Sequence, residues 1–157
     1  MKQANALSIE QAIQLMPAEF HPVIIQSGRK RIVKTQKGMA AFHQSSILKG
    51  GMWKTSHNED EIRDEIDYVI FALGFDGILV LPKDEILSFL DNNYSSRYSN
   101  NGVPIHIYLE GGRFIWKGKA DNTKDVSDYA YPYTNSRGAE CSWSDMSERT
   151  RRQWKLQ

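Results

Sequence analysis

The sequence predicts an α+β domain with a mixed central sheet flanked by two or three helices. Residues 68–73 and 78–81 are almost uninterrupted apolar runs, which is typical of strands covered on both faces. Residues 105–109 and 114–117 flank a Gly-Gly turn, and the alternation of the first arm is typical of a hairpin with one buried face. Residues 86–90 follow two acidic residues and repeat apolar side chains at helical spacing.

The N-terminal third adds a helix and a second hairpin. Residues 9–16 carry apolar side chains at helical spacing, and Pro17 ends this predicted helix. Residues 23–25 are a β-branched run, and a Ser-Gly turn leads to a second arm over residues 29–37. Residues 38–51 show no clear pattern and stay unassigned.

Length and composition indicate one domain over residues 1–157. The chain has 157 residues, of which 40% are hydrophobic and 25% charged, a balance that excludes a disordered chain or a coiled coil. Residues 119–157 are polar, with scattered aromatic side chains and a basic end, and we expect an irregular C-terminal extension there. The net charge of +1 gives no global argument for nucleic acid, so such an argument must be local.

The sequence predicts a soluble, cytoplasmic protein without a membrane partner. It shows neither a signal-peptide pattern nor an apolar stretch of about 20 residues. Cys141 is the single cysteine, which excludes an intramolecular disulfide and a cysteine metal cage. The four histidines lie far apart in the sequence and predict no metal site.

A group of acidic residues near one lysine is the most informative chemical pattern. A metal-dependent nuclease needs two or three carboxylates for a hard divalent cation, and an ammonium group to orient the attacking water. Glu65 and Asp67 stand at the entry of the predicted central strand, where an extended chain would point both to one side. We expect Glu65, Asp67 and Asp76 to hold Mg²⁺, and Lys54, Glu65 and Asp67 to be catalytic. The alternative is that residues 59–67 form a solvated loop.

The same region resembles a known nuclease superfamily. The segments Trp53-Lys54-Thr55-Ser56, Glu65-Ile66-Asp67-Tyr68-Val69-Ile70 and Gly77-Ile78-Leu79-Val80-Leu81-Pro82, followed by a helix near Asp84, resemble the core of the PD-(D/E)xK superfamily. That superfamily includes restriction enzymes, resolvases and some homing endonucleases. The resemblance covers about residues 50–92. It implies a restriction-endonuclease-like core and a divalent-metal-dependent DNA endonuclease, a hydrolase of phosphodiester bonds.

The resemblance is incomplete at the catalytic triad. Family members carry an acid or Gln two residues before the lysine, whereas Met52 stands before Lys54. If Lys83 is taken as the lysine instead, Leu81 replaces the acid. Aligning the motif with Lys34 as its lysine is a third possibility, and it also lacks the acid. Either the metal site includes a carboxylate from another position, or the chain has the family's fold but no catalytic activity.

A basic segment indicates contact with double-stranded DNA. Five cations fall within nine residues of one hairpin arm, and they suit the phosphate backbone. They are Arg29, Lys30, Arg31, Lys34 and Lys37. The alternative is a solvated edge strand whose charges prevent association of sheets. Cutting both strands with one such site would require a homodimer.

Two functions therefore follow from the sequence. The first is a magnesium-dependent DNA endonuclease. The second is a non-catalytic DNA-binding accessory factor, or an inhibitor protein of phage or plasmid type that binds a protein partner. The incomplete triad and the aromatic C-terminal extension favour the second.

Overall fold

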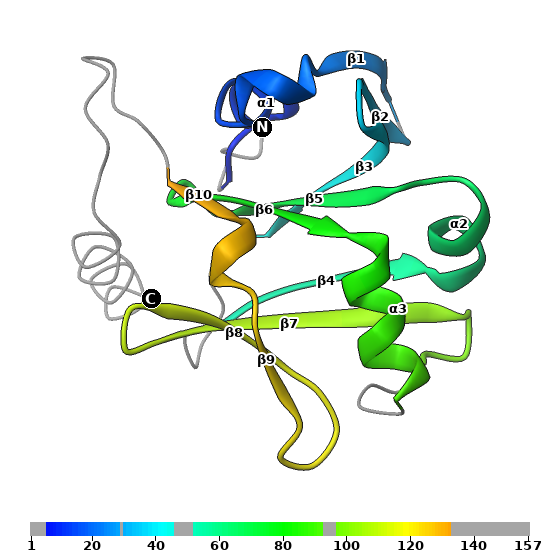
Figure 1. Ribbon diagram of the computed structural model, residues 1–157, viewed down its shortest axis with the longest axis vertical. Coiled ribbons are helices and arrows are strands. Elements are labelled where there is room, and N and C mark those ends of the chain that lie inside the picture. The colour runs from blue at the N-terminus through cyan, green and yellow to red at the C-terminus, as the bar shows by residue number, and fades with distance from the viewer. Residues whose placement is uncertain (1–5, 29, 46–51, 93–96, 133–157) are drawn as a thin grey trace, which may run out of the picture.

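The computed structural model describes residues 6–28, 30–45, 52–92 and 97–132, which form a mixed α+β fold with two sheets (Figure 1). The larger sheet has the strand order β1-β2-β3-β5-β6-β10. In it β3 and β5 run parallel, and the other neighbouring pairs are antiparallel. Its strands are β1 (Val23–Ser27), β2 (Arg31–Thr35), β3 (Gly38–Ser45), β5 (Tyr68–Leu73), β6 (Gly77–Pro82) and β10 (Ala130–Pro132).

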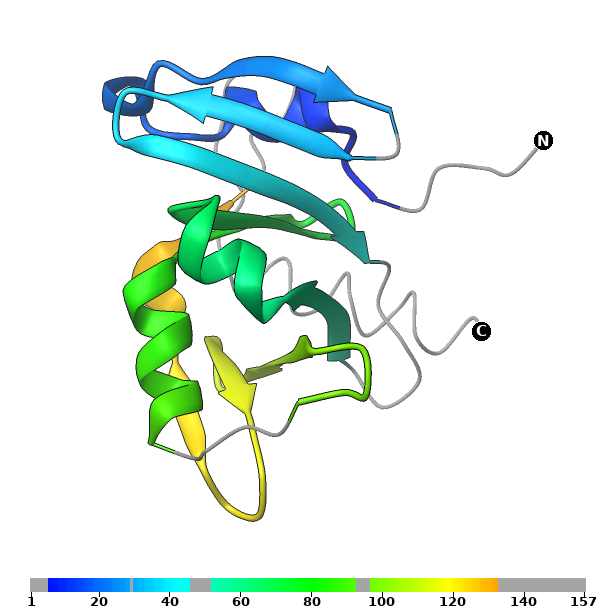
Figure 2. The ribbon, with the colours of Figure 1, turned by 90° about the vertical axis from the view of Figure 1, so that its right-hand side faces the viewer.

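A second, antiparallel sheet lies under part of the first (Figure 2). Its order is β4-β7-β8-β9, from β4 (Met52–Asn58), β7 (Gly102–Glu110), β8 (Arg113–Lys117) and β9 (Thr123–Asp125). The expectation of one central sheet was wrong in this respect. The predicted hairpin of residues 105–117 forms β7 and β8, but in a separate sheet that it shares with β4.

Helices cover both faces of the larger sheet. Helix α1 (Ile9–Gln14) begins at Ser8, whose hydroxyl and backbone form a capping box with Gln11. It packs on one face together with the 3₁₀ turn η1 (Ala18–Phe20). Helices α2 (Glu59–Asp64) and α3 (Lys83–Asp91) lie on the opposite face with the second sheet.

Strand β5 separates two hydrophobic clusters. Val69, Phe71 and Leu73 face the cluster between the two sheets, which includes the indoles of Trp53 and Trp116. Ile70 and Ala72 face the cluster under α1. Because both faces of β5 are buried, apolar side chains occupy every position of the strand and not every second one. This explains the continuous apolar run in the sequence.

Strands β1 and β2 extend past the second sheet, and we call this hairpin the overhang. Figure 2 shows it in blue and cyan at the side of the larger sheet away from the second sheet. Val23 and Ile25 on β1 are 58% and 48% exposed, unlike the apolar residues of β5. The overhang thus keeps apolar side chains accessible.

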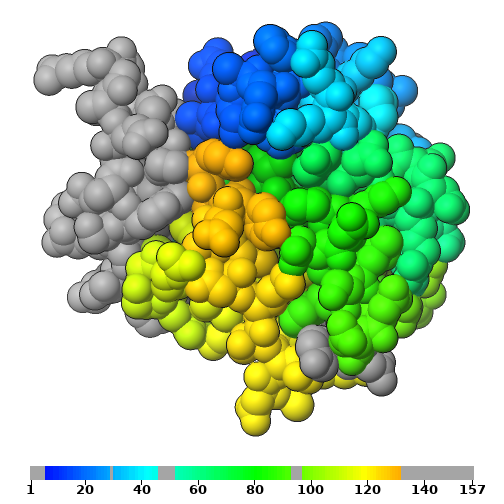
Figure 3. Space-filling model, in the orientation of Figure 1, coloured from blue at the N-terminus to red at the C-terminus, as the bar shows by residue number. Residues whose placement is uncertain are grey.

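The C-terminal part of the described chain joins both sheets. Strand β9 pairs with β8, the 3₁₀ turn η2 (Ser127–Tyr129) follows, and β10 pairs with β6. Figure 3 shows this yellow and orange segment packed beside α3. The rest of the predicted extension, residues 133–157 with Cys141, lies outside the described residues. None of the helices in the described ranges has the length and apolarity needed to cross a bilayer.

Candidate functional site

Asp67 stands at the start of β5, where its carboxylate is held by the neighbouring strand. Its Oδ2 accepts a hydrogen bond from the Met39 backbone N–H at 3.0 Å, and its Oδ1 lies 3.8 Å from Lys83 Nζ. Gly38 leaves room for this contact, since a Cβ there would lie 2.2 Å from Asp67 Oδ2. The carboxylate therefore links β3 to β5 in the parallel pair.

The structure does not bring Asp76 to Asp67. Asp76 is buried in the turn between β5 and β6, whereas Asp67 precedes β5. The two ends of a six-residue strand are roughly 17 Å apart. One cation cannot contact carboxylates at this separation, because its oxygen ligands lie at about 2.0–2.6 Å.

Lys54 also lies apart from the acidic residues. It is exposed on β4, where Trp53 points into the core between the sheets. Successive side chains of a strand point to opposite faces, so Lys54 points to the outer face of the second sheet. It pairs there in register with His106 on β7, and its positive charge adds to burial in lowering the His106 pKa.

Among the residues predicted to be catalytic or to bind metal, Glu65 lines a cavity. It caps the C-terminal end of α2 and is not part of an extended segment as the sequence suggested, because residues 59–64 are helical. Within the described residues, no three His, Cys, Asp or Glu side chains form a group that could hold a metal ion. The spatial grouping expected for Mg²⁺ is therefore not seen there.

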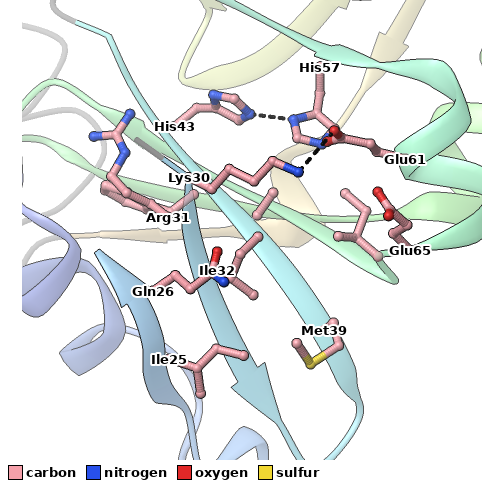
Figure 4. A pocket seen from close by; sticks show the side chains of 13 residues that line it. Ile25, Gln26, Lys30, Arg31, Ile32, Met39, His43, His57, Glu61 and Glu65 are labelled. Carbon is pink, nitrogen blue, oxygen red and sulfur yellow. Dashed lines mark hydrogen bonds and ion pairs between the residues drawn. The ribbon is translucent and has the colours of Figure 1, made fainter. Parts of the chain in front are cut away.

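The cavity has a volume of about 430 Å³ and opens between the overhang, β3, β4 and α2 (Figure 4). Pockets for small ligands generally measure roughly 300–1,000 Å³. The overhang contributes both apolar and polar residues to its lining, and β4 and α2 contribute a histidine and two glutamates. The lining residues are Ile25, Gln26, Lys30, Arg31, Ile32, Met39, Ala41, Phe42, His43, His57, Glu61, Glu65 and Ile66.

Two histidines form the polar wall of this cavity. His43 Nε2 lies 2.7 Å from His57 Nδ1, and His57 Nε2 lies 2.8 Å from Glu61 Oε2. The Glu61 carboxylate offers only acceptor oxygens, so the tautomer that suits both contacts has the ring proton of His57 on Nε2 and leaves Nδ1 to accept a hydrogen bond from His43 Nε2.

Both histidines are neutral near pH 7. Burial, together with the neighbouring His57 and Arg31, lowers the pKa of His43 to about 4. Burial also lowers the pKa of His57, although the Glu61 carboxylate opposes this effect. Perturbed titration beside a cavity is typical of functional sites, but ion-pair networks produce it as well.

Two of the predicted basic side chains lie on the cavity face, and a third lies on the opposite face of the same strand. Lys30 Nζ lies 3.6 Å from Glu61 Oε1, and the side chain of Lys30 is 66% exposed. Arg31 lies over the Phe42 ring, 5.2 Å from its centroid, and donates a hydrogen bond to Gln44 Oε1, so its guanidinium is on the α1 face of the larger sheet. Lys34 is exposed and pairs in register with Met39, a lining residue, so it lies on the cavity side of β2.

The other two cations predicted to contact DNA are Lys37 and Arg29. Lys37 lies 3.3 Å from Glu19 and 4.8 Å from the centroid of the Phe20 ring, on the side of α1. Arg29 lies outside the described residues.

Sequence reasoning missed His43, His57 and Glu61. His43 and His57 are fourteen positions apart on strands of different sheets, so no spacing rule links them. Helix α2 did carry a signal, because Asn58 caps it and three acids fill its first turn. Had that helix been recognised, Glu61 and Glu65 would have been placed on one helical face.

The chain matches no protein-family model, no curated protein and no solved structure.

Proposed function

We propose that this chain is a non-catalytic nucleic-acid-binding protein that contacts the phosphate backbone with the cavity side of the overhang. The observation that carries this proposal is the position of Lys30 and Lys34 on the cavity face of the overhang, with Arg31 beside them on the opposite face of β2. In the turn that follows β2, Lys37 is engaged with η1. A local group of cations attracts phosphates even when the net charge is close to zero.

The ion pair of Lys30 does not argue against phosphate binding. Lys30 is largely exposed and its distance to Glu61 is 3.6 Å. Exposed pairs of this kind contribute about 0–1 kcal/mol. Exchanging such a pair for a phosphate contact therefore costs little. Arg31 is positioned by Phe42 and Gln44, which reduces the entropy lost on binding.

The salt dependence of duplex binding tests this proposal. Fluorescence anisotropy with a labelled DNA duplex should show affinity that falls as salt rises, with a slope of about −2 to −3 for three phosphate contacts. Lys34→Ala should reduce the magnitude of the slope by about 1. Lys54→Ala is the matched control, another exposed lysine on the outer face of the second sheet, and should leave the slope unchanged.

A magnesium-dependent endonuclease remains the second candidate. The grouping that favours it is Asp67 with Lys83 at 3.8 Å, at the end of β5 nearest Glu65. Incubation with supercoiled plasmid and Mg²⁺ separates the two candidates. Nicking that disappears in Asp67→Asn and with a chelator contradicts the non-catalytic proposal, whereas intact plasmid together with salt-sensitive duplex binding supports it. Absence of both activities leaves the protein-binding inhibitor.

A further inference from the structure

Aromatic side chains form a row along β7 on the outer face of the second sheet. Ile105 and Ile107 of β7 are fully buried between the two sheets, so the alternating His106 and Tyr108 point outward. The Tyr98 ring continues this row, because its hydroxyl lies 3.4 Å from His106 Nε2. We call Tyr98, His106 and Tyr108 the aromatic row.

The chain before β7 holds Tyr98 against the sheet and leaves its ring accessible. The backbone N–H of Tyr98 donates to the carbonyl oxygen of Gly102 at 2.9 Å, and the backbone N–H of Asn101 donates to the carbonyl oxygen of Tyr98 at 2.9 Å. Gly102 makes room for the ring, since a Cβ there would lie 3.4 Å from Tyr98 Cδ2. The Tyr98 side chain is nevertheless 41% exposed. An aromatic ring that is both fixed and accessible is typical of a binding surface.

The spacing and protonation of the aromatic row suit the stacking of bases. Side chains two positions apart on a strand are separated by roughly 6–7 Å, so His106 and Tyr108 can each take a different base of an extended strand. Burial, together with the positive charge of Lys54, lowers the pKa of His106, so its ring is neutral near pH 7. Sheets that bind single-stranded RNA stack bases on aromatic side chains of this kind.

A lysine stands beside the aromatic row. Lys117 belongs to β8, the neighbour of β7, and its Nζ lies 4.3 Å from the centroid of the Tyr108 ring. It also pairs with Glu110, but the two side chains are 40% and 51% exposed, and exposed pairs contribute little to stability. The ammonium group can therefore exchange Glu110 for a phosphate. Flat rings next to a cation are complementary to unpaired bases on an anionic backbone.

We propose that the outer face of the second sheet binds single-stranded nucleic acid, with bases stacked on the aromatic row and a phosphate held by Lys117. In a duplex the bases are paired and stacked on each other, so a duplex cannot use this row. Every base has a flat face, so we expect little sequence preference. The site lies on a different face from the overhang and goes beyond the proposed contact with duplex DNA.

Fluorescence anisotropy of a labelled oligothymidylate with the full chain tests the inference. Tyr98→Ala and Tyr108→Ala should each weaken binding by about 5- to 150-fold, the range for loss of one stacked base. Tyr98→Phe keeps the ring and should retain the affinity. Phe75→Ala is the matched control, since Phe75 is 37% exposed in the turn between β5 and β6. A strand of equal length with abasic sites in place of the bases should bind more weakly than oligothymidylate.

The outcomes separate this inference from the proposed function. Loss of oligothymidylate binding in Tyr98→Ala, with duplex binding unchanged, supports the inference. Tyrosine variants that bind like Phe75→Ala overturn it, and so does equal binding of the abasic strand and oligothymidylate. The proposed function depends only on the duplex measurements and stands or falls with them. Circular dichroism of each variant checks that the fold is retained.

Discussion

His43 Nε2 lies 2.7 Å from His57 Nδ1, and this contact connects β3 of the larger sheet to β4 of the second sheet. The backbone N–H of Lys54 also donates to Ser45 Oγ, at 3.1 Å, between the same two strands. The histidine contact requires one ring nitrogen without a proton, because two imidazolium rings offer only donors. The junction of the two sheets is therefore sensitive to pH.

We expect the free energy of unfolding to fall as the pH drops from about 6.5 to about 4. The unfolded chain takes up a proton at His43 near pH 6.5, whereas the folded chain takes it up only near its folded pKa of about 4. The unfolded state thus binds more protons in this window, and stability is lost as the pH falls, by roughly 2 kcal/mol. Urea unfolding at a series of pH values measures the loss.

His43→Gln should weaken this pH dependence, since the amide can still donate to His57 but does not titrate. His57 contributes in the same direction because its pKa is also lowered, so some dependence remains in the variant. An unchanged slope between pH 4 and 6.5 in His43→Gln would show that His43 is not the group responsible.

Gly38→Ala should destabilise the protein by roughly 2–4 kcal/mol. Gly38 has a φ of +133°, and an added Cβ would lie 2.2 Å from Asp67 Oδ2, so the contact that links β3 to β5 must shift. Gly28→Ala is the control, because nothing lies within 4 Å of a Cβ at that position. Equal urea midpoints for the two variants would contradict the role of Gly38.

Glu59→Gln should lower stability by about 1–3 kcal/mol. The Glu59 side chain is 11% exposed and accepts hydrogen bonds from Arg97 and Arg63, the latter at 2.8 Å. The hydrogen bond from Arg97 is the main reason why the pKa of Glu59 is held at about 2. Thermal unfolding at neutral pH measures the effect, with exposed Asp121→Asn as the control. A Tm equal to that of the control would contradict this prediction.

Ile70→Ala and Ile25→Ala should differ strongly in their effects on stability. Ile70 is fully buried under α1, and its truncation should cost about 2–5 kcal/mol. Ile25 is 48% exposed on the overhang, and its truncation should change stability by less than about 0.5 kcal/mol. Chemical unfolding of both variants makes the comparison. A large loss in Ile25→Ala would mean that the floor of the cavity is structural and not reserved for a ligand.

Much of the fold was predictable where the local pattern decides the structure. Each of these signals lies within a few neighbouring residues. They are the apolar runs that form β5 and β6, the helical spacing of α3 and the alternation of β7. The segment that forms β3 gave no such signal. Its side chains range from buried Phe42 to exposed Gln44, and its place beside β5 depends on a parallel pairing across 28 positions, as in Ala40 with Tyr68.

The candidate site was much less predictable than the fold. The sequence predicted functional roles for Glu65 and the basic residues of β2, and in the structure these residues lie at the cavity or near it. It could not show that Lys54 points away from the acids, because that depends on which face of β4 packs against the larger sheet. The partition into two sheets depends on pairing of β4 with β7, which lie far apart in the sequence.

In the described part of the chain the larger sheet ends in two edge strands, the three-residue β10 beside β6 and the longer β1 beside β2. Strand β1 contains no charged side chain, although charges are a common protection at such a border. At high protein concentration, intermolecular strand addition should therefore start at β1, and a lysine in place of Val23 should raise the concentration at which the protein self-associates.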